Sequence, residues 1–430
     1  MSSFENDEIS SKKNNNSDLN RLEKQSVNSS DEIHREIYKK LKWYENPVLQ
    51  TSSSNQAKTT TYSSFYSSLC TGLLIVAFLP IILIAFVLFL LLWILPGLGW
   101  FYERYAEARD RKKYYPPIDE MKPWGPDNKL IHVVHLRAPE SKLPPIVYVS
   151  GMGLSMYFVK PLLLKFVEYM DEPVEIISFD PLGYGASEPP NDWNTENAES
   201  QRLLLRQVIA KSTLRKPFIL FGASAGGLLA HLYCLTYPED VAGIILTDPT
   251  PSTIFEQGSP IGKVLNRACI QCGIMARAAS WGLLRPLSFL LHHFSTGDVG
   301  DIFRYSHPGY IALLMTHTML QKLASQLRYL HTIPDCISKQ LHDDATSHRN
   351  IPLLVLSALN WTKKRPYGGF TREEMSQWWS ESHQFFVRNS DNAGFIPRTD
   401  YTHMQCIVDM ELAANATKAA LTQIHSEIVH

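Results

Sequence analysis

A serine flanked by glycines is the feature of this sequence with the clearest chemical potential. Residues 222–226 read Gly-Ala-Ser-Ala-Gly, directly after the apolar run 217–222 and before a helical pattern. A sharp turn between a strand and a helix would expose the Ser224 hydroxyl, and the first helical amides would point at the same spot. These groups are a nucleophile and donors for a developing oxyanion, so the pattern predicts acyl transfer. A purely structural turn is the alternative interpretation.

Short apolar runs alternate with helical patterns through the C-terminal part of the chain. The candidate strands are 130–136, 146–150, 174–180, 217–222, 241–248, 351–357 and, more weakly, 384–389, and the helical patterns between them are 157–169, 196–211, 224–237 and 413–428. Continuous apolar strands that alternate with helices indicate an α/β fold with a mostly parallel sheet, covered by helices on both faces. In such sheets, reactive side chains gather at the carboxyl ends of the strands.

One long interval interrupts this alternation. Residues 249–350 separate two candidate strands, and roughly 100 residues is too long for a simple loop. Helical periodicity dominates the interval, most clearly over 261–284 and 311–330. An inserted helical cap over the sheet is therefore expected.

Four motifs together give residues 121–430 a resemblance to the α/β-hydrolase fold family. They are the loop Ser150-Gly151-Met152-Gly153 after one strand, the loop 180–187 with the pattern Asp-x-x-Gly-x-Gly-x-Ser, the nucleophile turn 222–227, and His403 before the last helical pattern. The resemblance implies Ser224 as nucleophile, His403 as general base, and the backbone amides of Met152 and Ala225 as an oxyanion hole.

The sequence departs from the family pattern at two positions. Ser150 stands where the family usually has a histidine, which should matter little because the hole uses backbone donors. No Asp or Glu directly follows the strand candidate 351–357, where the family usually places the acid of the triad. Asp248, at the end of an earlier strand, is the preferred candidate, and Asn360 and Asp391 are the alternatives.

The resemblance implies a serine hydrolase that cleaves a carboxylic ester. The apolar cap, together with a membrane segment expected nearer the N-terminus, favours a lipid or another hydrophobic ester as substrate. There are two alternatives: an acyltransferase that uses the same residues, and a catalytically inactive scaffold or receptor of this fold. No cofactor or metal is expected, and the Cys269-x-x-Cys272 pair is interpreted as helical packing rather than a metal or redox site. With 41 basic and 42 acidic residues, the chain lacks the basic excess typical of nucleic-acid binding.

The N-terminal part has a different character. Residues 1–62 are polar and rich in Ser and Asn, which predicts a disordered tail. From Thr59 to Tyr102 no residue is charged, and as a helix the apolar run 69–95 would reach roughly 40 Å, more than the roughly 30 Å bilayer core. We therefore expect a single-pass transmembrane segment over 63–102; Pro80 leaves a re-entrant hairpin as the alternative.

A basic linker is expected over 103–120, between this segment and the hydrolase domain 121–430. Arg104, Arg109 and Lys112 lie on this side of the apolar run, and the other side has only Lys58 nearby. By the positive-inside rule, this distribution predicts a cytosolic hydrolase domain, with a lumenal domain as the alternative. The expected partners are thus the bilayer and a hydrophobic ester; the sequence identifies no protein partner.

Overall fold

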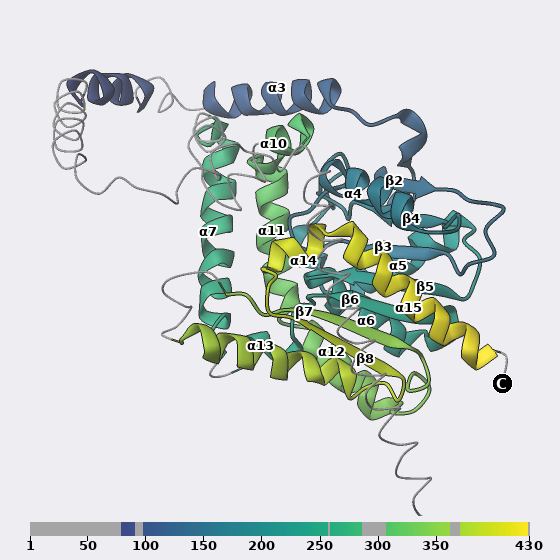
Figure 1. The fold of residues 1–430 in the computed structure, drawn as a ribbon. Coiled ribbons are helices and arrows are strands. Elements are labelled where there is room, and N and C mark those ends of the chain that lie inside the picture. The colour runs from purple at the N-terminus through teal and green to yellow at the C-terminus, as the bar shows by residue number, and fades with distance from the viewer. Residues whose placement is uncertain (1–78, 91–97, 257–258, 286–306, 362–369, 429–430) are drawn as a thin grey trace, which may run out of the picture. The chain divides into compact units, whose positions relative to one another are not determined.

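The computed structural model describes residues 79–90, 98–256, 259–285, 307–361 and 370–428 (Figure 1). The chain divides into two compact units, residues 1–86 and 87–430. Within the first unit, the described residues 79–86 are helical and largely exposed. The second unit contains the sheet and every element discussed below.

An eight-stranded sheet forms the centre of the second unit, in the order β1-β2-β4-β3-β5-β6-β7-β8. The strands are β1 (Met121–Lys122), β2 (Ile131–Leu136), β3 (Ile146–Val149), β4 (Ile176–Phe179), β5 (Phe218–Ala223), β6 (Val241–Thr247), β7 (Leu353–Ala358) and β8 (Ala393–Arg398). β1 and β2 pair antiparallel to their neighbours, and all other pairs are parallel. The expected mostly parallel sheet is confirmed.

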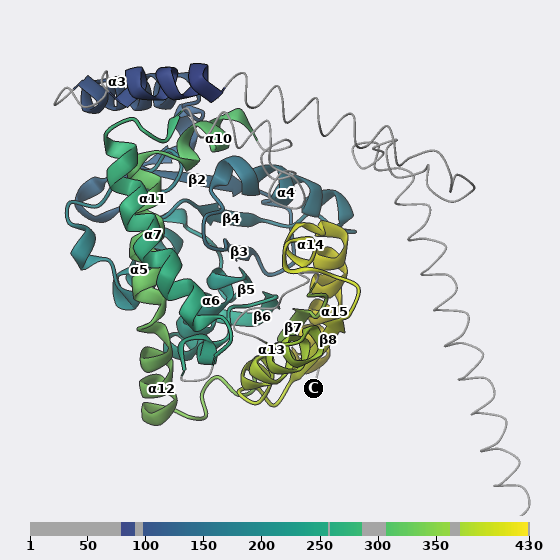
Figure 2. The same ribbon diagram turned by 90° about the vertical axis from the view of Figure 1, so that its left-hand side faces the viewer.

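Helices cover both faces of this sheet (Figure 2). On one face, α4 (Met156–Tyr169) and α15 (Met410–Ile428) pack on Ile219, Phe221 and the neighbouring residues. On the other face, α5 (Ala198–Ser212), α6 (Ala225–Thr236) and α12 (Ile333–Asp343) pack on Phe218, Leu220 and their neighbours. Because both faces are buried, each central strand is apolar at successive positions rather than at alternate ones.

The weak strand candidate 384–389 is wrong, because most of it belongs to α13 (Arg372–Val387). A capping box of Thr371 and Glu374 begins this helix, and Phe386 is buried in the core. The last strand is instead β8, a half-buried edge strand. Its sequence Ala-Gly-Phe-Ile-Pro-Arg contains a glycine and a proline, which weaken the pattern of a strand.

The described part of the interval between β6 and β7, where the cap is expected, is largely helical. It contains α7 (Gly262–Ser280), α10 (Pro308–Leu314), α11 (His317–Leu330) and α12. α7 packs along α11. At this contact the Cys269 thiol of α7 donates to the Ala324 carbonyl of α11 at 3.5 Å. The predicted helix 311–330 is divided in two because Thr316 caps the start of α11.

The predictions for the N-terminal region fall largely outside the described residues. This holds for the disordered tail, and for residues 63–78 and 91–97 of the expected transmembrane segment. In the ranges that the structure describes, no helix is both long and apolar enough to cross a bilayer. Residues 98–113 form one helix, α3. This helix covers the last residues of the expected transmembrane segment and the first residues of the expected linker.

Candidate active site

Ser224 lies at a strained turn between β5 and α6. Its backbone has φ 52° and ψ −123°, in the positive-φ region that residues other than glycine rarely adopt. The Ser224 amide donates to the Thr247 carbonyl at 3.0 Å, and the Ser224 carbonyl accepts from the Thr250 amide at 2.9 Å. β6 and the loop that follows it thus hold the turn in place through both backbone groups of Ser224.

Gly226 lets α6 approach β3 closely behind this turn. A Cβ atom added at Gly226 would lie 2.1 Å from the Val149 carbonyl oxygen and 2.5 Å from that of Ser150. Both obstacles are backbone atoms, so a side chain could be accommodated only by moving the strand or the helix. The glycine after the serine is therefore required by packing.

Gly226→Ala is expected to lower the free energy of unfolding by about 3 kcal/mol or more because of this overlap. Gly273 in α7 provides a matched control, since nothing lies within 4 Å of a Cβ atom added there. Gly273→Ala should stabilise the protein by about 0.5–1 kcal/mol through helix propensity. Chemical denaturation of both variants measures the contrast; equal effects would contradict the close approach at Gly226.

The structure brings His403 and Asp248 to the serine. His403 Nε2 lies 3.0 Å from Ser224 Oγ, and His403 Nδ1 lies 2.5 Å from Asp248 Oδ2. His403 is the first residue of α14 (His403–Val408), which a Thr402–Gln405 capping box begins. Asp248 is buried, whereas the His403 side chain is 38% exposed. A serine, an imidazole and a buried carboxylate thus form one hydrogen-bonded chain that solvent can reach.

Two further donors hold the Asp248 carboxylate in this orientation. Asp248 Oδ1 accepts from the Ala358 amide at 2.8 Å and from Trp379 Nε1 at 2.7 Å. The backbone of Asp248 also has a positive φ of 43°. Because Oδ1 is occupied by these donors, Oδ2 is directed to the imidazole. Sequence reasoning missed Trp379, which stands 131 positions along the chain from Asp248 and belongs to no local motif.

Trp379→Phe is expected to lower kcat for an ester substrate by about 10-fold with little change in KM, because one hydrogen bond to a buried carboxylate is lost. Trp378→Phe is the matched control: Trp378 lies next to Trp379 on α13 and contacts its ring, but donates no hydrogen bond to Asp248 within the described structure. Steady-state kinetics on both variants would test this. Equal kcat values for the two variants would show that the indole donor does not matter.

The side chains of the alternative candidates for the acid bond to other partners. The Asn360 side-chain amide donates to the Asp400 carbonyl at 3.3 Å. Asp391 is exposed and forms an ion pair with Arg349 at 2.8 Å. Of the three candidates, the structure therefore brings Asp248 to His403.

The loop with the expected oxyanion donors passes directly over the serine. A Cβ atom added at Gly151 would lie 3.1 Å from Ser224 Cβ. Within the part of the chain that the structure describes, the amides of Met152 and Ala225 donate to no protein acceptor. Two tyrosines hold the loop: the Gly153 amide donates to the Tyr184 hydroxyl at 2.8 Å, and the Tyr310 hydroxyl of α10 donates to the Gly153 carbonyl at 3.1 Å. The cap thus helps to position the loop.

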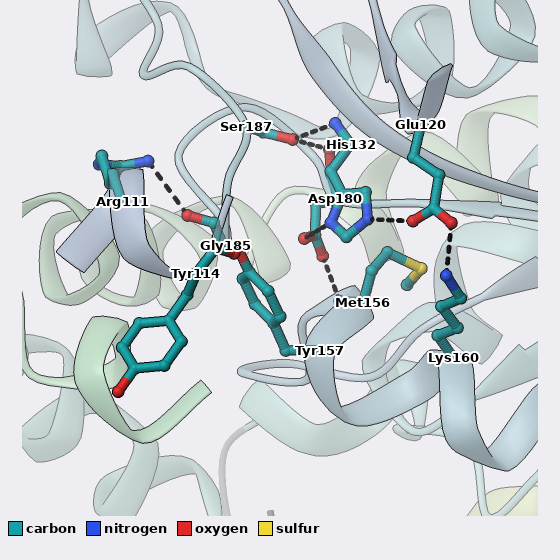
Figure 3. Close-up of polar contacts among 10 residues, drawn as sticks. All are labelled: Arg111, Tyr114, Glu120, His132, Met156, Tyr157, Lys160, Asp180, Gly185 and Ser187. Atoms are coloured by element: carbon teal, nitrogen blue, oxygen red, sulfur yellow. Dashed lines mark hydrogen bonds and ion pairs between the residues drawn. The ribbon is translucent and has the colours of Figure 1, made fainter. Parts of the chain in front are cut away.

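A buried polar cluster lies under the start of α4, just after this loop (Figure 3). Asp180 accepts from the Met156 amide at 2.8 Å and lies 3.4 Å from His132, whose other ring nitrogen is 3.0 Å from Glu120. Burial acts to lower the pKa of His132, but the two carboxyl groups outweigh it and hold that pKa above its usual value. Burial raises the pKa of Asp180. This cluster fixes the N-terminus of α4 and, with it, the end of the loop.

A cavity of about 360 Å³ opens beside the cluster, away from the serine. It is lined by Lys113, Tyr114, Tyr115, Pro116, Pro117, Glu120, His132, Met156, Tyr157, Lys160, Pro161 and His307. Neither Ser224 nor His403 nor Asp248 contributes to its lining.

Comparisons with known proteins agree with this architecture. Residues 144–265 match the model of a family described as alpha/beta hydrolase fold. A probable 1-acylglycerol-3-phosphate O-acyltransferase of Oryza sativa subsp. japonica is 31% identical over 26% of this chain and 26% of its own length. A (lyso)-N-acylphosphatidylethanolamine lipase of Mus musculus is 29% identical over 29% of this chain and 35% of its own length. The chain thus spans about a quarter to a third of the length of these relatives.

A crystal structure of a carboxylesterase from the thaumarchaeon Nitrososphaera gargenis superposes with a TM-score of 0.51. It shares 12% identity with this chain and covers 70% of it and 97% of the carboxylesterase chain. At that identity the similarity concerns the fold alone. The structural similarity covers 70% of the chain, well beyond the segment 144–265 that matches the family model.

Proposed function

Since the chain has the α/β-hydrolase fold, we propose that it is a serine hydrolase that cleaves a carboxylic ester through an acyl-enzyme intermediate. The observation that carries the proposal is the hydrogen-bonded chain from Ser224 Oγ through the His403 imidazole to Asp248. The strained turn that presents Ser224 supports it, because strain of this kind persists where the surrounding structure maintains it for function.

In the proposed reaction, Ser224 Oγ attacks the ester carbonyl carbon while His403 Nε2 takes the hydroxyl proton. Asp248 keeps the Nδ1 proton of the imidazole in place and stabilises the imidazolium that forms. The amides of Met152 and Ala225 donate to the carbonyl oxygen as it gains negative charge. The alkoxide then leaves with the proton from His403, and water repeats the sequence to release the acid and restore Ser224.

A lipid or another hydrophobic ester is the proposed substrate. The support is the name of the murine relative, a lipase of acylated phosphatidylethanolamines, and the long apolar run that precedes the catalytic unit. The test is an ester panel of increasing acyl-chain length, assayed with the full-length protein. We expect kcat/KM to rise with chain length; hydrolysis of acetyl esters alone would reject the lipid part of the proposal and leave the esterase part intact.

Acyl transfer to an alcohol is the second candidate, and the name of the rice relative, an acyltransferase, favours it. The same acyl-enzyme would form, but an acceptor hydroxyl would take the place of water in the second half. Product analysis with and without an acceptor such as a lysophospholipid separates the two. A new ester that accumulates at the expense of free acid would identify a transferase.

We also propose that the apolar run anchors the protein in a membrane with the catalytic unit in the cytosol, following the distribution of Lys and Arg around it. Carbonate extraction tests the anchoring, and protease protection in sealed vesicles tests the side. Protection of the catalytic unit would reverse the orientation. Release by carbonate would reject the anchor.

A further inference from the structure

α3 (Leu98–Lys113) buries a face of small and acidic residues instead of an apolar one. Its buried residues are Gly99, Glu103, Ala106 and Asp110, which recur every three or four positions and so form one face. This face packs on α7 and α10, and Figure 1 shows α3 lying across the ends of these two helices. Two of the four buried residues are acidic, and the other two are small.

An arginine of the cap holds both buried acids. Arg285 Nε lies 2.6 Å from Glu103, and a terminal nitrogen of Arg285 lies 2.5 Å from Asp110. Burial raises the pKa of Glu103 to about 7, although Arg285 acts in the opposite direction. The third acid of α3, Glu107, is bonded to Arg111 at 3.0 Å. The acidic groups of α3 are therefore turned inward or bonded to a cation.

The outward face of α3 is aromatic and basic. Phe101 and Tyr105 are 66% and 68% exposed, and Trp100 is exposed beside them, with the Arg104 guanidinium 5.2 Å above its ring. Every charged residue that is exposed on α3 is basic: Arg104, Arg109, Lys112 and Lys113. The aromatic residues occupy the first half of the helix, and most of the basic residues occupy the second.

The composition of this face matches the surface of an anionic bilayer. Aromatic side chains are enriched at the level of the lipid headgroups, and Lys and Arg are attracted by anionic lipids. A protein partner would need acidic groups opposite the basic half and an apolar pocket opposite the aromatic half. The sequence itself favours lipid, because the uncharged apolar run 69–95 ends just before α3 begins at Leu98.

We propose that α3 binds along the surface of an anionic lipid bilayer, with Phe101 and Tyr105 among the headgroups and the buried acidic face directed to the catalytic unit. The helix would then determine the orientation of the catalytic unit relative to the lipid surface. This proposal does not rest on the catalytic function, since it concerns neither Ser224 nor its partners. Nor does it require the preceding run to cross the membrane.

The test places an environment-sensitive fluorescent amino acid at position 105 of the full-length protein, in lipid nanodiscs that contain brominated phospholipid. Position 203 is the matched control: Leu203 on α5 is an exposed apolar residue at 49%. Bromine quenches only fluorophores that reach the lipid. We expect quenching at 105 to exceed quenching at 203 by about threefold or more.

Charge reversal tests the anionic part of the proposal. Lys112→Glu should reduce quenching at position 105 by about twofold in nanodiscs that contain phosphatidylserine. Lys339→Glu on α12, which makes the same change at an exposed lysine of another helix, should leave this quenching unchanged. Quenching at 105 no greater than at 203 would overturn the proposal. In lipid-free protein, a blue shift of the fluorophore emission at position 105 that grows with protein concentration would also overturn the proposal. It would show that the outward face of α3 binds a second copy of the chain.

Discussion

Ser224→Ala is expected to lower kcat/KM for an ester substrate by about 10⁴-fold or more, because the variant lacks the oxygen that would accept the acyl group. The reason is local: His403 Nε2 lies 3.0 Å from Ser224 Oγ, and removal of that oxygen leaves the imidazole without a nucleophile to deprotonate. The residual rate would come from substrate binding and the oxyanion donors alone. Kinetics with the best ester of the chain-length panel provide the measurement.

The Ser224 variant should remain folded, since the turn is held by backbone groups that alanine retains. Ser280→Ala is the matched control, because the Ser280 hydroxyl is exposed and bonds only to the Arg277 carbonyl within the described structure. The control should have the activity and the melting temperature of the original protein. An active Ser224→Ala protein would remove Ser224 from the reaction, whatever the identity of the substrate.

Asp248→Asn is expected to lower kcat by about 10⁴-fold while the protein stays folded. Asp248 Oδ1 accepts two hydrogen bonds, from the Ala358 amide and from Trp379 Nε1. In the variant, the amide oxygen must take that place, so the NH₂ group would face His403 Nδ1. The imidazole would then carry its proton on Nε2 and present an N–H to Ser224, which is the wrong tautomer for a base.

Asp391→Asn is the matched control for this prediction, since it makes the same chemical change at the other aspartate considered for the role. Asp391 is exposed and pairs with Arg349, and surface ion pairs of this kind contribute little to stability. The control should keep its activity. Near-normal activity of Asp248→Asn, with both variants folded, would show that the imidazole needs no carboxylate at this position.

Local sequence was sufficient to predict the nucleophile turn and the central strands. The strand, the tight glycines and the helix around Ser224 are contiguous, so their pattern is visible in a short window. Burial on both faces makes strands such as β5 and β6 uniformly apolar, which gives them a strong signal. Asp248 could be proposed because it ends one of those strands.

The rest of the site depends on contacts between distant parts of the chain. Trp379 reaches Asp248 from α13, and Tyr310 reaches the loop at Gly153 from the cap, and neither residue has a local pattern that indicates its partner. The edge strand β8 was missed because partial burial, a glycine and a proline weaken its pattern. α3 covers the end of the expected transmembrane segment and the start of the expected linker; because its inward face is small and acidic rather than apolar, it lacks the usual pattern of a packed helix.

Covalent labelling by a fluorophosphonate measures the central proposal most directly. The probe forms a bond between its phosphorus and a serine oxygen only where a base activates that serine and the phosphoryl oxygen is stabilised. For the full-length protein, we expect an adduct on the peptide that contains Ser224, absent in Ser224→Ala and strongly reduced in His403→Ala. No adduct on the original protein, or an adduct that persists in Ser224→Ala, would contradict it.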